Sequence, residues 1–402
     1  MPTVSIRQYT ATDPLQLSGP MLRDLLGPHR RHIDVIPSGA GEHVLRANRY
    51  VGVVRLPELD VVMTPKVSPL AVLWMMGYVN GVALRDIAWA GLAREQGLLE
   101  VVARLFAGQV RELIHRGLYQ EYVERDETLA FVRGRVLMLE TLRQGRGLSH
   151  RPTCRHAEMT TDTAVNQSLR NATEILMRLS YGAGDVTGAL DRNLRLLIEA
   201  GVSRTPNKPP PDEHLNRLNA HYHPALGVAR LIMEHATLRL EAGTVQSPAF
   251  LVNMDSVFQA YVGALLRRQA EALGLQFRSE PTVYLDTART VKIRPDIVLL
   301  RAGRAAIVAD AKYKLTTSED NFYQALAYAK ALDLRRVALV YPDDGEVEPA
   351  IIRVRHDGTE VLVRTLPVGR GHRDFIDLDQ RAASAALSLL TELTEQVDVA
   401  AA

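Results

Sequence analysis

The chain has 402 residues, enough for two or three domains of ordinary size. Hydrophobic residues make up 47% and charged residues 23% of the sequence, as in globular proteins that fold in water, and the net charge of +2 gives no global preference for nucleic acid or lipid. The single cysteine, Cys154, excludes an intrachain disulfide and any zinc site built from several cysteines.

No stretch of the sequence approaches the ~18 consecutive apolar residues of a membrane-spanning helix. The opening residues, MPTVSIRQYTATDP, lack the basic and then apolar order of a secretion signal, so we expect a cytoplasmic protein with no membrane contact. The sequence contains no G-x-x-x-x-G-K-[ST] phosphate-binding loop. We therefore expect that the chain binds no nucleotide itself and that another chain supplies any nucleotide-driven step.

The N-terminal part is predicted to begin with strands and to continue with helices. Residues 43–67 alternate apolar and polar positions between turn residues, which predicts two or three strands of an antiparallel meander. Residues 98–117 carry apolar side chains at helical spacing and predict a helix. Residues 118–138 are interpreted as a hairpin that turns near Arg125-Asp126-Glu127.

The middle of the chain is predicted to be helical and then interrupted. The helical pattern covers residues 162–200. Residues 203–214 contain four prolines in twelve positions, which favours an extended connection. A further helix is expected at about 223–241.

The C-terminal part is predicted to be rich in strands with helices between them, a pattern typical of an α/β domain. The expected elements are helices at 254–273, 319–332 and 373–396, and a hairpin that turns at residues 356–359. The sequence thus predicts an α+β or α/β protein in three parts: residues 1–202, a proline-rich connection with a helix at 203–245, and residues 246–402.

A short stretch of the C-terminal part, IRPDIVLLRAGRAAIVADAKYK, places charged residues in two strand-like runs. With a three-residue turn at Ala302-Gly303-Arg304, Arg301 would pair with Ala305 and Asp296 would lie opposite Asp310. Because side chains two positions apart share a face, Lys312 would project beside them. A two-residue turn would shift this register by one.

Two carboxylates held opposite each other repel, and a bound divalent cation offsets that repulsion. Mg²⁺ prefers oxygen ligands and can also hold a substrate phosphate. With Lys312 positioned to orient or deprotonate a water, these residues indicate hydrolysis of a phosphodiester. The alternative is that Asp296 and Lys312 form a cross-strand ion pair while Asp310 faces water.

The helix predicted at 319–332 adds two polar residues to this site. Gln324 and Tyr328 are four positions apart and so share a helix face. Beside a nuclease centre they would contact the DNA backbone or orient Lys312. The alternative is that Tyr328 packs into the sheet with Gln324 at its rim.

These residues resemble the PD-(D/E)xK nuclease superfamily, with P-D at Pro295-Asp296, D-x-K at Asp310-Ala311-Lys312 and Q-x-x-x-Y at Gln324 to Tyr328. More of the chain, from about residue 118 to residue 342, is similar to McrC-like proteins, the nuclease subunits of McrBC-type restriction systems. The stretches that carry this resemblance are FVRGRVLMLETLRQ, CRHAEMTTDTAVNQSLRNATEIL and NMDSVFQAYVGALLRR.

The resemblance implies a division of labour. The N-terminal region would dock on a hexameric AAA+ GTPase that recognises methylated double-stranded DNA, and residues 246–402 would form the nuclease domain. Catalytic roles would fall to Asp296, Asp310, Lys312, Gln324 and Tyr328, with Mg²⁺ or Mn²⁺ held by Asp296 and Asp310.

One position departs from the family pattern. The helix before the hairpin usually carries Phe-Glu, whose glutamate completes the metal site, but this chain has Phe258-Gln259. Glutamine offers a carbonyl oxygen without a charge. Asp255 or Glu280 are alternative ligands.

Two other functions stay open at this point. In the first, the chain is an adaptor that activates its motor without cutting DNA, with Gln259 marking the loss of catalysis. In the second, it is a stand-alone DNA repair nuclease. Arg133 or Arg135, in an R-G-R motif, would suit a role at a neighbouring nucleotide site, although the sequence does not single out one basic residue.

Overall fold

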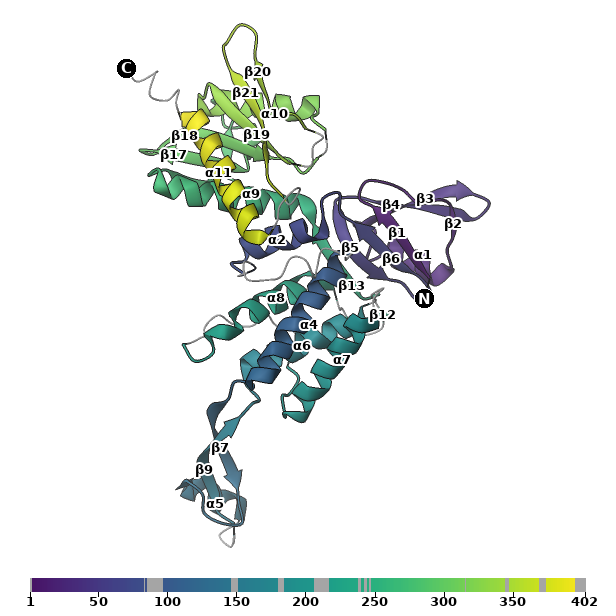
Figure 1. Cartoon of the computed structure of the whole chain (residues 1–402), viewed down its shortest axis with the longest axis vertical. Coiled ribbons are helices and arrows are strands. Elements are labelled where there is room, and N and C mark those ends of the chain that lie inside the picture. Colours follow the sequence, from purple (N-terminus) through teal and green to yellow (C-terminus); the bar gives the residue numbers. More distant parts are fainter. Residues whose placement is uncertain are drawn as a thin grey trace. The chain divides into compact units, whose positions relative to one another are not determined.

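The computed structural model describes residues 2–82, 84, 97–145, 151–179, 184–205, 217–237, 240–241, 244–245, 247–314, 316–343, 347–368 and 374–394 (Figure 1). The chain forms two compact units. The first comprises Met1–Leu105, Leu179–Gly182 and His235–Ala402, and the second comprises Phe106–Arg178 and Ala183–Glu234. Within the described residues, no helix is both long and apolar enough to cross a membrane.

This division differs from the expected linear order of 1–202, 203–245 and 246–402. Strand β13 (Ala249–Asn253) pairs antiparallel with β5 (Tyr50–Arg55), so the C-terminal half completes an N-terminal sheet. Such pairing between distant segments leaves no mark in local periodicity. Most of the proline-rich connection, residues 206–216, lies outside the described residues.

The N-terminal sheet has the strand order β1-β6-β5-β13-β10, where β1 (Thr3–Arg7) runs parallel to β6 (Asp60–Thr64) and the other neighbours are antiparallel. β10 is Ala236–Thr237. A smaller sheet has the order β2-β4-β3, from Leu15–Gln16, Glu42–Ala47 and Ile33–Gly39. The expected meander is therefore confirmed for β5 and β6, whereas β4 joins the smaller sheet.

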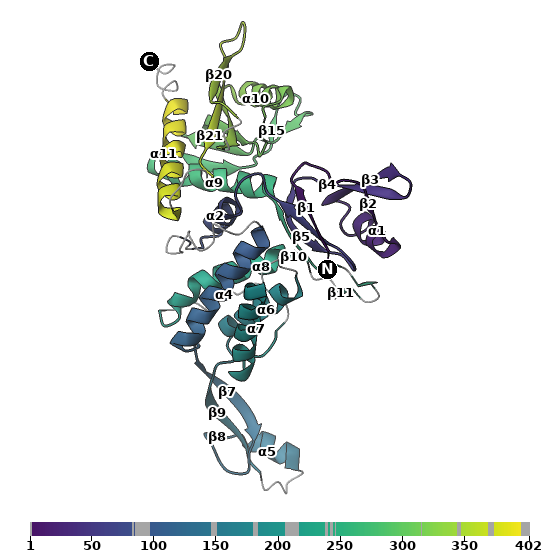
Figure 2. The same cartoon turned by 45° about the vertical axis from the view of Figure 1, so that its right-hand side comes forward.

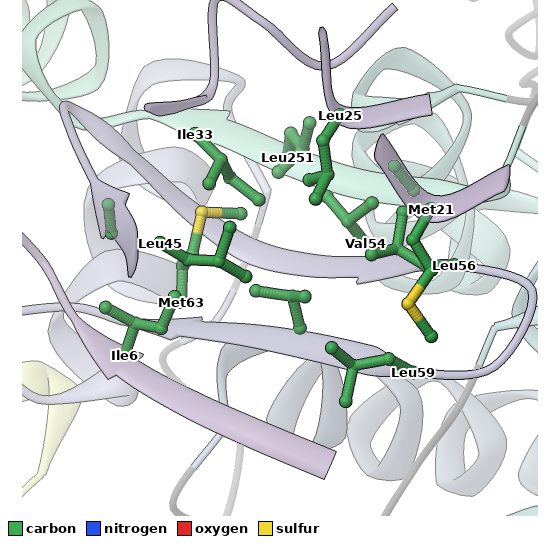
Figure 3. Close-up of a cluster of buried hydrophobic side chains, with 13 residues drawn as sticks. Ile6, Met21, Leu25, Ile33, Leu45, Val54, Leu56, Leu59, Met63 and Leu251 are labelled. Carbon is green, nitrogen blue, oxygen red and sulfur yellow. The ribbon is translucent and has the colours of Figure 1, made fainter. Parts of the chain in front are cut away.

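A common core joins these two sheets to helix α1 (Gly19–Leu26), as Figure 3 shows. Apolar side chains from all of these elements are removed from water, which is the main stabilising contribution of this region. The labelled residues are Ile6, Met21, Leu25, Ile33, Leu45, Val54, Leu56, Leu59, Met63 and Leu251.

Helix α2 (Pro69–Val79) connects this region to helix α9 (Met254–Ala272), on which it packs. Trp74 Nε1 donates a hydrogen bond to Tyr261 Oη at 3.2 Å, and the Trp74 ring stacks on Phe375 at 5.5 Å. Because α2 is apolar on all sides, it must be buried. The two halves of the first unit thus share one packed helix interface.

The C-terminal half of this unit is built on a mixed six-stranded sheet of order β14-β17-β18-β19-β21-β20. The central strand β18 is antiparallel to β17 and parallel to β19, which is itself parallel to β21. The strand bounds are Gln276–Ser279, Ile297–Arg301, Arg304–Ala311, Arg336–Pro342, Glu360–Leu366 and Ala350–Arg353 in that spatial order.

Helices flank both sides of this sheet, with α10 (Glu319–Leu332) opposite α11 (Phe375–Thr394) in Figures 1 and 2. Helix α9 also contacts β14 and β18. The sequence predictions of these three helices and of the β20–β21 hairpin are confirmed. Their long amphipathic patterns and the Asp357-Gly358 turn are strong local signals. Two short antiparallel pairs complete the unit, β11 (Leu240–Glu241) with β12 (Thr244–Val245) and β15 (Val283–Tyr284) with β16 (Lys292–Ile293).

The second unit consists of helices and a projecting ribbon of strands (Figure 2). Its helices are the part of α4 (Leu98–Arg116) from residue 106, α6 (Ala164–Arg178), α7 (Gly184–Glu199), the 3-10 turn Ala220–Tyr222 and α8 (His223–His235). The ribbon, here called the β7–β9 ribbon, comprises β7 (Glu121–Thr128), β8 (Arg135–Val136), α5 (Met138–Gly145) and β9 (Thr153–Thr160).

The prediction of a hairpin at residues 118–138 is wrong. Strand β7 continues through Arg125, Asp126 and Glu127 without a turn, and it pairs with β9 over eight residues. The charged run is tolerated because this ribbon is exposed: Arg155 Nε donates to Asp126 Oδ1 across the strands at 2.7 Å. A charged tripeptide is a weak turn signal when it carries no glycine or proline.

The base of the ribbon is fixed by buried hydrogen bonds. Asn166 Nδ2 donates to the carbonyl oxygens of Tyr119 and Thr161, which lie just before β7 and just after β9. Tyr222 accepts from the N–H of Tyr119 at 2.7 Å and donates to Asn166 Oδ1 at 3.0 Å. Both ends of the ribbon are therefore tied to helix α6, so its direction is set within this unit.

Candidate active site

Two aspartates lie side by side at one end of the β17–β18 hairpin. Ile297 pairs with Ala309, and one step further along this register Asp296 lies opposite Asp310. The N–H of Ala311 donates to Asp296 Oδ2 at 2.8 Å, which holds this carboxylate against β18. The structure thus brings together the two carboxylates that the sequence pairs, while their role as metal ligands stays a prediction.

The predicted register of this hairpin forms with a different turn from the predicted one. Its turn has two residues, Ala302 and Gly303, with φ of +50° and +80°, so the three-residue turn is wrong and Arg301 pairs with Arg304. The turn alone would shift the carboxylates out of register. A β-bulge with Ala306 as the extra residue restores it.

The carboxylate pair carries more negative charge than one lysine neutralises. Asp310 is 1% exposed, and burial, followed by the charge of Asp310, raises the pKa of Asp296 to about 7. Lys312 Nζ lies 2.5 Å from Asp310 Oδ2, although the angles are not those of a hydrogen bond. The alternative ion pair between Asp296 and Lys312, with Asp310 facing water, is therefore not what forms.

Lys312 is held by a chain of hydrogen bonds from helix α10. Its Nζ donates to Gln324 Oε1 at 2.7 Å, Gln324 Nε2 donates to Tyr328 Oη at 2.7 Å, and Tyr328 Oη donates to the carbonyl of Arg294 at 2.9 Å. Tyr328 is 1% exposed and belongs to the core between α10 and the sheet. The two expectations for this helix hold together, since Tyr328 packs in the core and also orients Gln324 toward Lys312.

The positions considered as a third ligand have different partners in the structure. Gln259 Nε2 donates to Glu280 Oε1 at 2.9 Å, and both residues line one groove with Asp296. Asp255 instead lies 3.8 Å from Arg49 of the N-terminal sheet, and burial raises the pKa of Asp255. In the part of the chain that the structure describes, no three His, Cys, Asp or Glu side chains form a metal-binding group.

These residues fit a divalent cation bound in the manner of Mg²⁺. Mg²⁺ keeps several waters and needs only one or two protein carboxylates, which Asp296 and Asp310 provide. The buried Asp310 Oδ2 has the Lys312 ammonium as its neighbour at 2.5 Å, while burial and then the charge of Asp310 raise the pKa of Asp296 beside it. Glu280 and the side-chain carbonyl oxygen of Gln259 are further oxygen groups that line the same groove as Asp296.

Sequence reasoning missed the arginines that continue this groove along α9 and β14, Arg267 and Arg278. A signal was present in α9: Ser256, Ala260 and Gly263 are small residues at helical spacing, followed by Arg267 on the same face. It also missed Arg49, because a contact between the N-terminal sheet and Asp255 has no local sequence pattern.

The fold and site are those of an α+β protein whose mixed sheet carries a carboxylate pair beside a lysine. Over residues 45–342 the sequence matches the family described as McrBC 5-methylcytosine restriction system component, and the chain belongs to that family. No curated protein matches it.

Two solved structures of proteins from Thermococcus gammatolerans contain similar chains. One is the refined half-complex from a tetradecameric assembly of McrB AAA+ hexamers with bound McrC, with a TM-score of 0.67, 16% identity, and coverage of 94% of this chain and 99% of the other. The second is the McrBC complex, with a TM-score of 0.48, 19% identity, and coverage of 66% and 88%. At this identity, the first likeness shows a shared fold.

Proposed function

We propose that this protein is the DNA-cutting subunit of a modification-dependent restriction system, an endonuclease that hydrolyses phosphodiester bonds with Mg²⁺ or Mn²⁺. The observation that carries the proposal is the placement of Asp296 opposite Asp310 with Lys312 against them. This is the residue pattern of PD-(D/E)xK nucleases, and membership of a restriction-system family supports it.

A cation held by Asp296 and Asp310 would supply a bound water of lowered pKa and neutralise charge on the phosphate. Lys312 is the residue of this chain that positions the attacking water and the scissile phosphate. Its Nζ is held by Gln324 and donates a hydrogen bond to the attacking water or to a non-bridging oxygen of the scissile phosphate. Tyr328 and the Arg294 carbonyl are positioning groups that fix Gln324 and do not contact DNA.

We infer further that the β7–β9 ribbon docks on an AAA+ GTPase hexamer that recognises methylated DNA. The solved structure of similar fold is described as McrB AAA+ hexamers with bound McrC. The ribbon exposes large apolar side chains beside arginines, as protein interfaces do. The exposed apolar residues are Tyr122, Phe131, Val132, Met138, Leu139, Leu142 and Met159. The arginines Arg133 and Arg135 lie among them.

The test is purification of the chain with the AAA+ protein encoded beside it, followed by incubation with methylated and unmethylated plasmid, Mg²⁺ and GTP. The complex is expected to cut methylated plasmid, and the complex with Asp310→Asn is expected to bind the partner without cutting. Cleavage by the Asp310→Asn complex at the wild-type rate would contradict the assignment of the site.

The hydrogen bond between Gln259 and Glu280 favours a second candidate, an adaptor that stimulates its partner without cutting DNA. Gln259 occupies the position where the family pattern has a metal-binding glutamate, and its side chain is already engaged by Glu280. The same experiment separates the two functions, since an adaptor raises GTP turnover by the partner while the methylated plasmid stays intact with Mg²⁺ and with Mn²⁺.

A further inference from the structure

A groove runs from the carboxylate pair along helix α9. It encloses about 840 Å³ between α9 and β14, and the candidate metal ligand Asp296 forms part of its wall. Its charged and polar lining includes Gln259, Arg267, Arg268, Arg278 and Glu280. Because Asp296 itself lines the groove, a ligand that lies in the groove can reach a group bound at Asp296.

The floor of this α9–β14 groove is made of small side chains. Ser256, Ala260, Gly263 and Ala264 all line it. Gly263 is buried, and a Cβ there would make ordinary contact with Phe277 Cζ at 3.5 Å. The exposed small residues Ser256 and Ala260 are what leave the floor open to a ligand.

Two arginines give the groove positive charge: Arg278 lies on β14 two residues before Glu280, and Arg267 lies further along α9. The guanidinium of Arg267 lies 5.0 Å from the centre of the Phe277 ring, which restricts its orientation. Among the described residues neither Arg267 nor Arg278 forms an ion pair, whereas Arg268 contacts Asp379 at 3.4 Å. Exposed cations on a concave surface attract a polyanion most strongly where no carboxylate already neutralises them.

Three carboxylates also line the groove: Glu271, Glu280 and Asp296. Glu280 and Asp296 are at the end where a cation is expected, and Glu280 already accepts a hydrogen bond from Gln259. Glu271, one helical turn beyond Arg267, is the remaining carboxylate. The groove thus carries Arg278 beside its acidic end and a second arginine, Arg267, further along α9.

We propose that the α9–β14 groove binds the DNA strand next to the scissile phosphate, with Arg267 and Arg278 contacting its phosphates. This inference rests on the proposed function, that Asp296 and Asp310 form the site of DNA cleavage. Arg267 lies eight residues beyond Gln259, about 12 Å along the helix. That span corresponds to about three or four nucleotides of a B-form strand at about 3.4 Å each.

The experiment measures binding of a fluorescein-labelled DNA duplex to the full-length chain in EDTA, over a series of KCl concentrations. Arg267→Gln and Arg278→Gln are each expected to weaken binding and to reduce the slope of log K against log salt by about 1. Arg304→Gln is the matched control, because this exposed arginine is the first residue of β18, at the opposite end of the hairpin from Asp296.

Two further variants separate charge from structure. Glu271→Gln is expected to strengthen binding, and Arg267→Lys, which keeps the charge, is expected to retain most of the affinity that Arg267→Gln loses. The unfolding midpoint of each variant is measured alongside. Wild-type affinity and slope in both Arg267→Gln and Arg278→Gln, or absence of DNA binding by the wild-type chain, would overturn the proposal.

The proposed function can fail separately. If Asp310→Asn abolishes cleavage by the partner complex while both arginine variants bind DNA as the wild type does, only the groove assignment is wrong. If Asp310→Asn still cuts DNA while the arginine variants lose binding, the groove stands and the cleavage site is elsewhere.

Discussion

Asp296 lies opposite Asp310 only because the bulge at Ala306 compensates for a tight two-residue turn. The strand pair therefore contains one irregular residue, and its effect is to place the buried carboxylate of Asp310 against the half-buried carboxylate of Asp296. A regular ladder from the same turn would put their side chains out of register. The bulge thus brings together the two negative charges that a cation would neutralise.

The first prediction concerns pH and the metal-free protein. The folded-state pKa of Asp296, about 7, lies above its ordinary value of 3.8, so the folded state binds more protons than the unfolded state between these values. The free energy of unfolding is expected to fall as pH rises from about 4 to about 7, by up to about 1.4 kcal/mol per pH unit from this group, and to level off above that.

The measurement is urea unfolding of the wild type and of Asp296→Asn in EDTA across this range. The difference between the two proteins should change in favour of the variant as pH rises. Mg²⁺ or Mn²⁺ is expected to reverse the trend for the wild type alone, because the cation favours the ionised pair. If the unfolding free energies of the two proteins change with pH in parallel in EDTA, the pKa of Asp296 is not raised in the folded state.

The second prediction concerns the support of Lys312. Tyr328→Phe removes the hydroxyl that joins Gln324 to the Arg294 carbonyl and leaves both without this partner, at a cost of about 1–3 kcal/mol in unfolding free energy. Cleavage is expected to fall about 10- to 100-fold through kcat rather than KM, since the lysine loses its fixed position.

Tyr323→Phe is the matched control, because Tyr323 lies on the same helix and is 64% exposed. Its unfolding and cleavage should equal those of the wild type. A changed pH–rate profile in Tyr328→Phe would mark a positioning role, whereas loss of stability with unchanged kcat would restrict Tyr328 to packing.

The sequence predicted most of the C-terminal half because its signals are local. The bounds of α10 and the Asp357-Gly358 turn follow from amphipathic spacing and turn residues within a few positions. The residue types of the candidate site are visible in the sequence, and their catalytic roles stay predictions. The bulge at Ala306 was not predicted, because alanine carries no bulge signal. Interactions between distant segments, such as β13 with β5, were also missed, since they depend on tertiary packing.

The third prediction tests this kind of distant pairing. Gly52 in β5 has φ of +131°, and an added Cβ would lie 1.9 Å from the carbonyl oxygen of Phe250 in β13. Gly52→Ala is therefore expected to lower the unfolding free energy by at least about 3 kcal/mol. Gly39→Ala, also at positive φ but with open space around it, should cost only about 1 kcal/mol. Equal losses in chemical unfolding would mean that backbone strain, and not the close approach of β13, governs Gly52.

The fourth prediction concerns the unusual Gln259. Gln259→Glu places a carboxylate against Glu280 in place of a hydrogen bond, which lowers the stability of the metal-free protein by up to about 1 kcal/mol. Mn²⁺ should then raise the thermal unfolding midpoint more than in the wild type, while Glu280→Gln should respond less. The same Mn²⁺ response in all three proteins would exclude both positions from the metal site.

The last prediction concerns the β7–β9 ribbon and the partner. Gly134 has φ of +73°, and a Cβ there would lie 2.3 Å from the carbonyl oxygen of Arg155 in β9. Gly134→Ala is expected to displace β8 and with it Arg133 and Arg135, because the backbone of β9 cannot yield without breaking its pairing with β7. GTP turnover by the partner should then rise far less on addition of the full-length variant than on addition of the wild type.

Two controls make this outcome specific to the ribbon. Gly108→Ala adds a Cβ in open space on helix α4 and should stimulate the partner normally, with a gain of about 0.5–1 kcal/mol in stability. Asp310→Asn should also stimulate normally, because the carboxylate pair belongs to a different unit of the chain from the ribbon. Full stimulation by Gly134→Ala, or loss of stimulation in Asp310→Asn, would place the activating surface outside the ribbon.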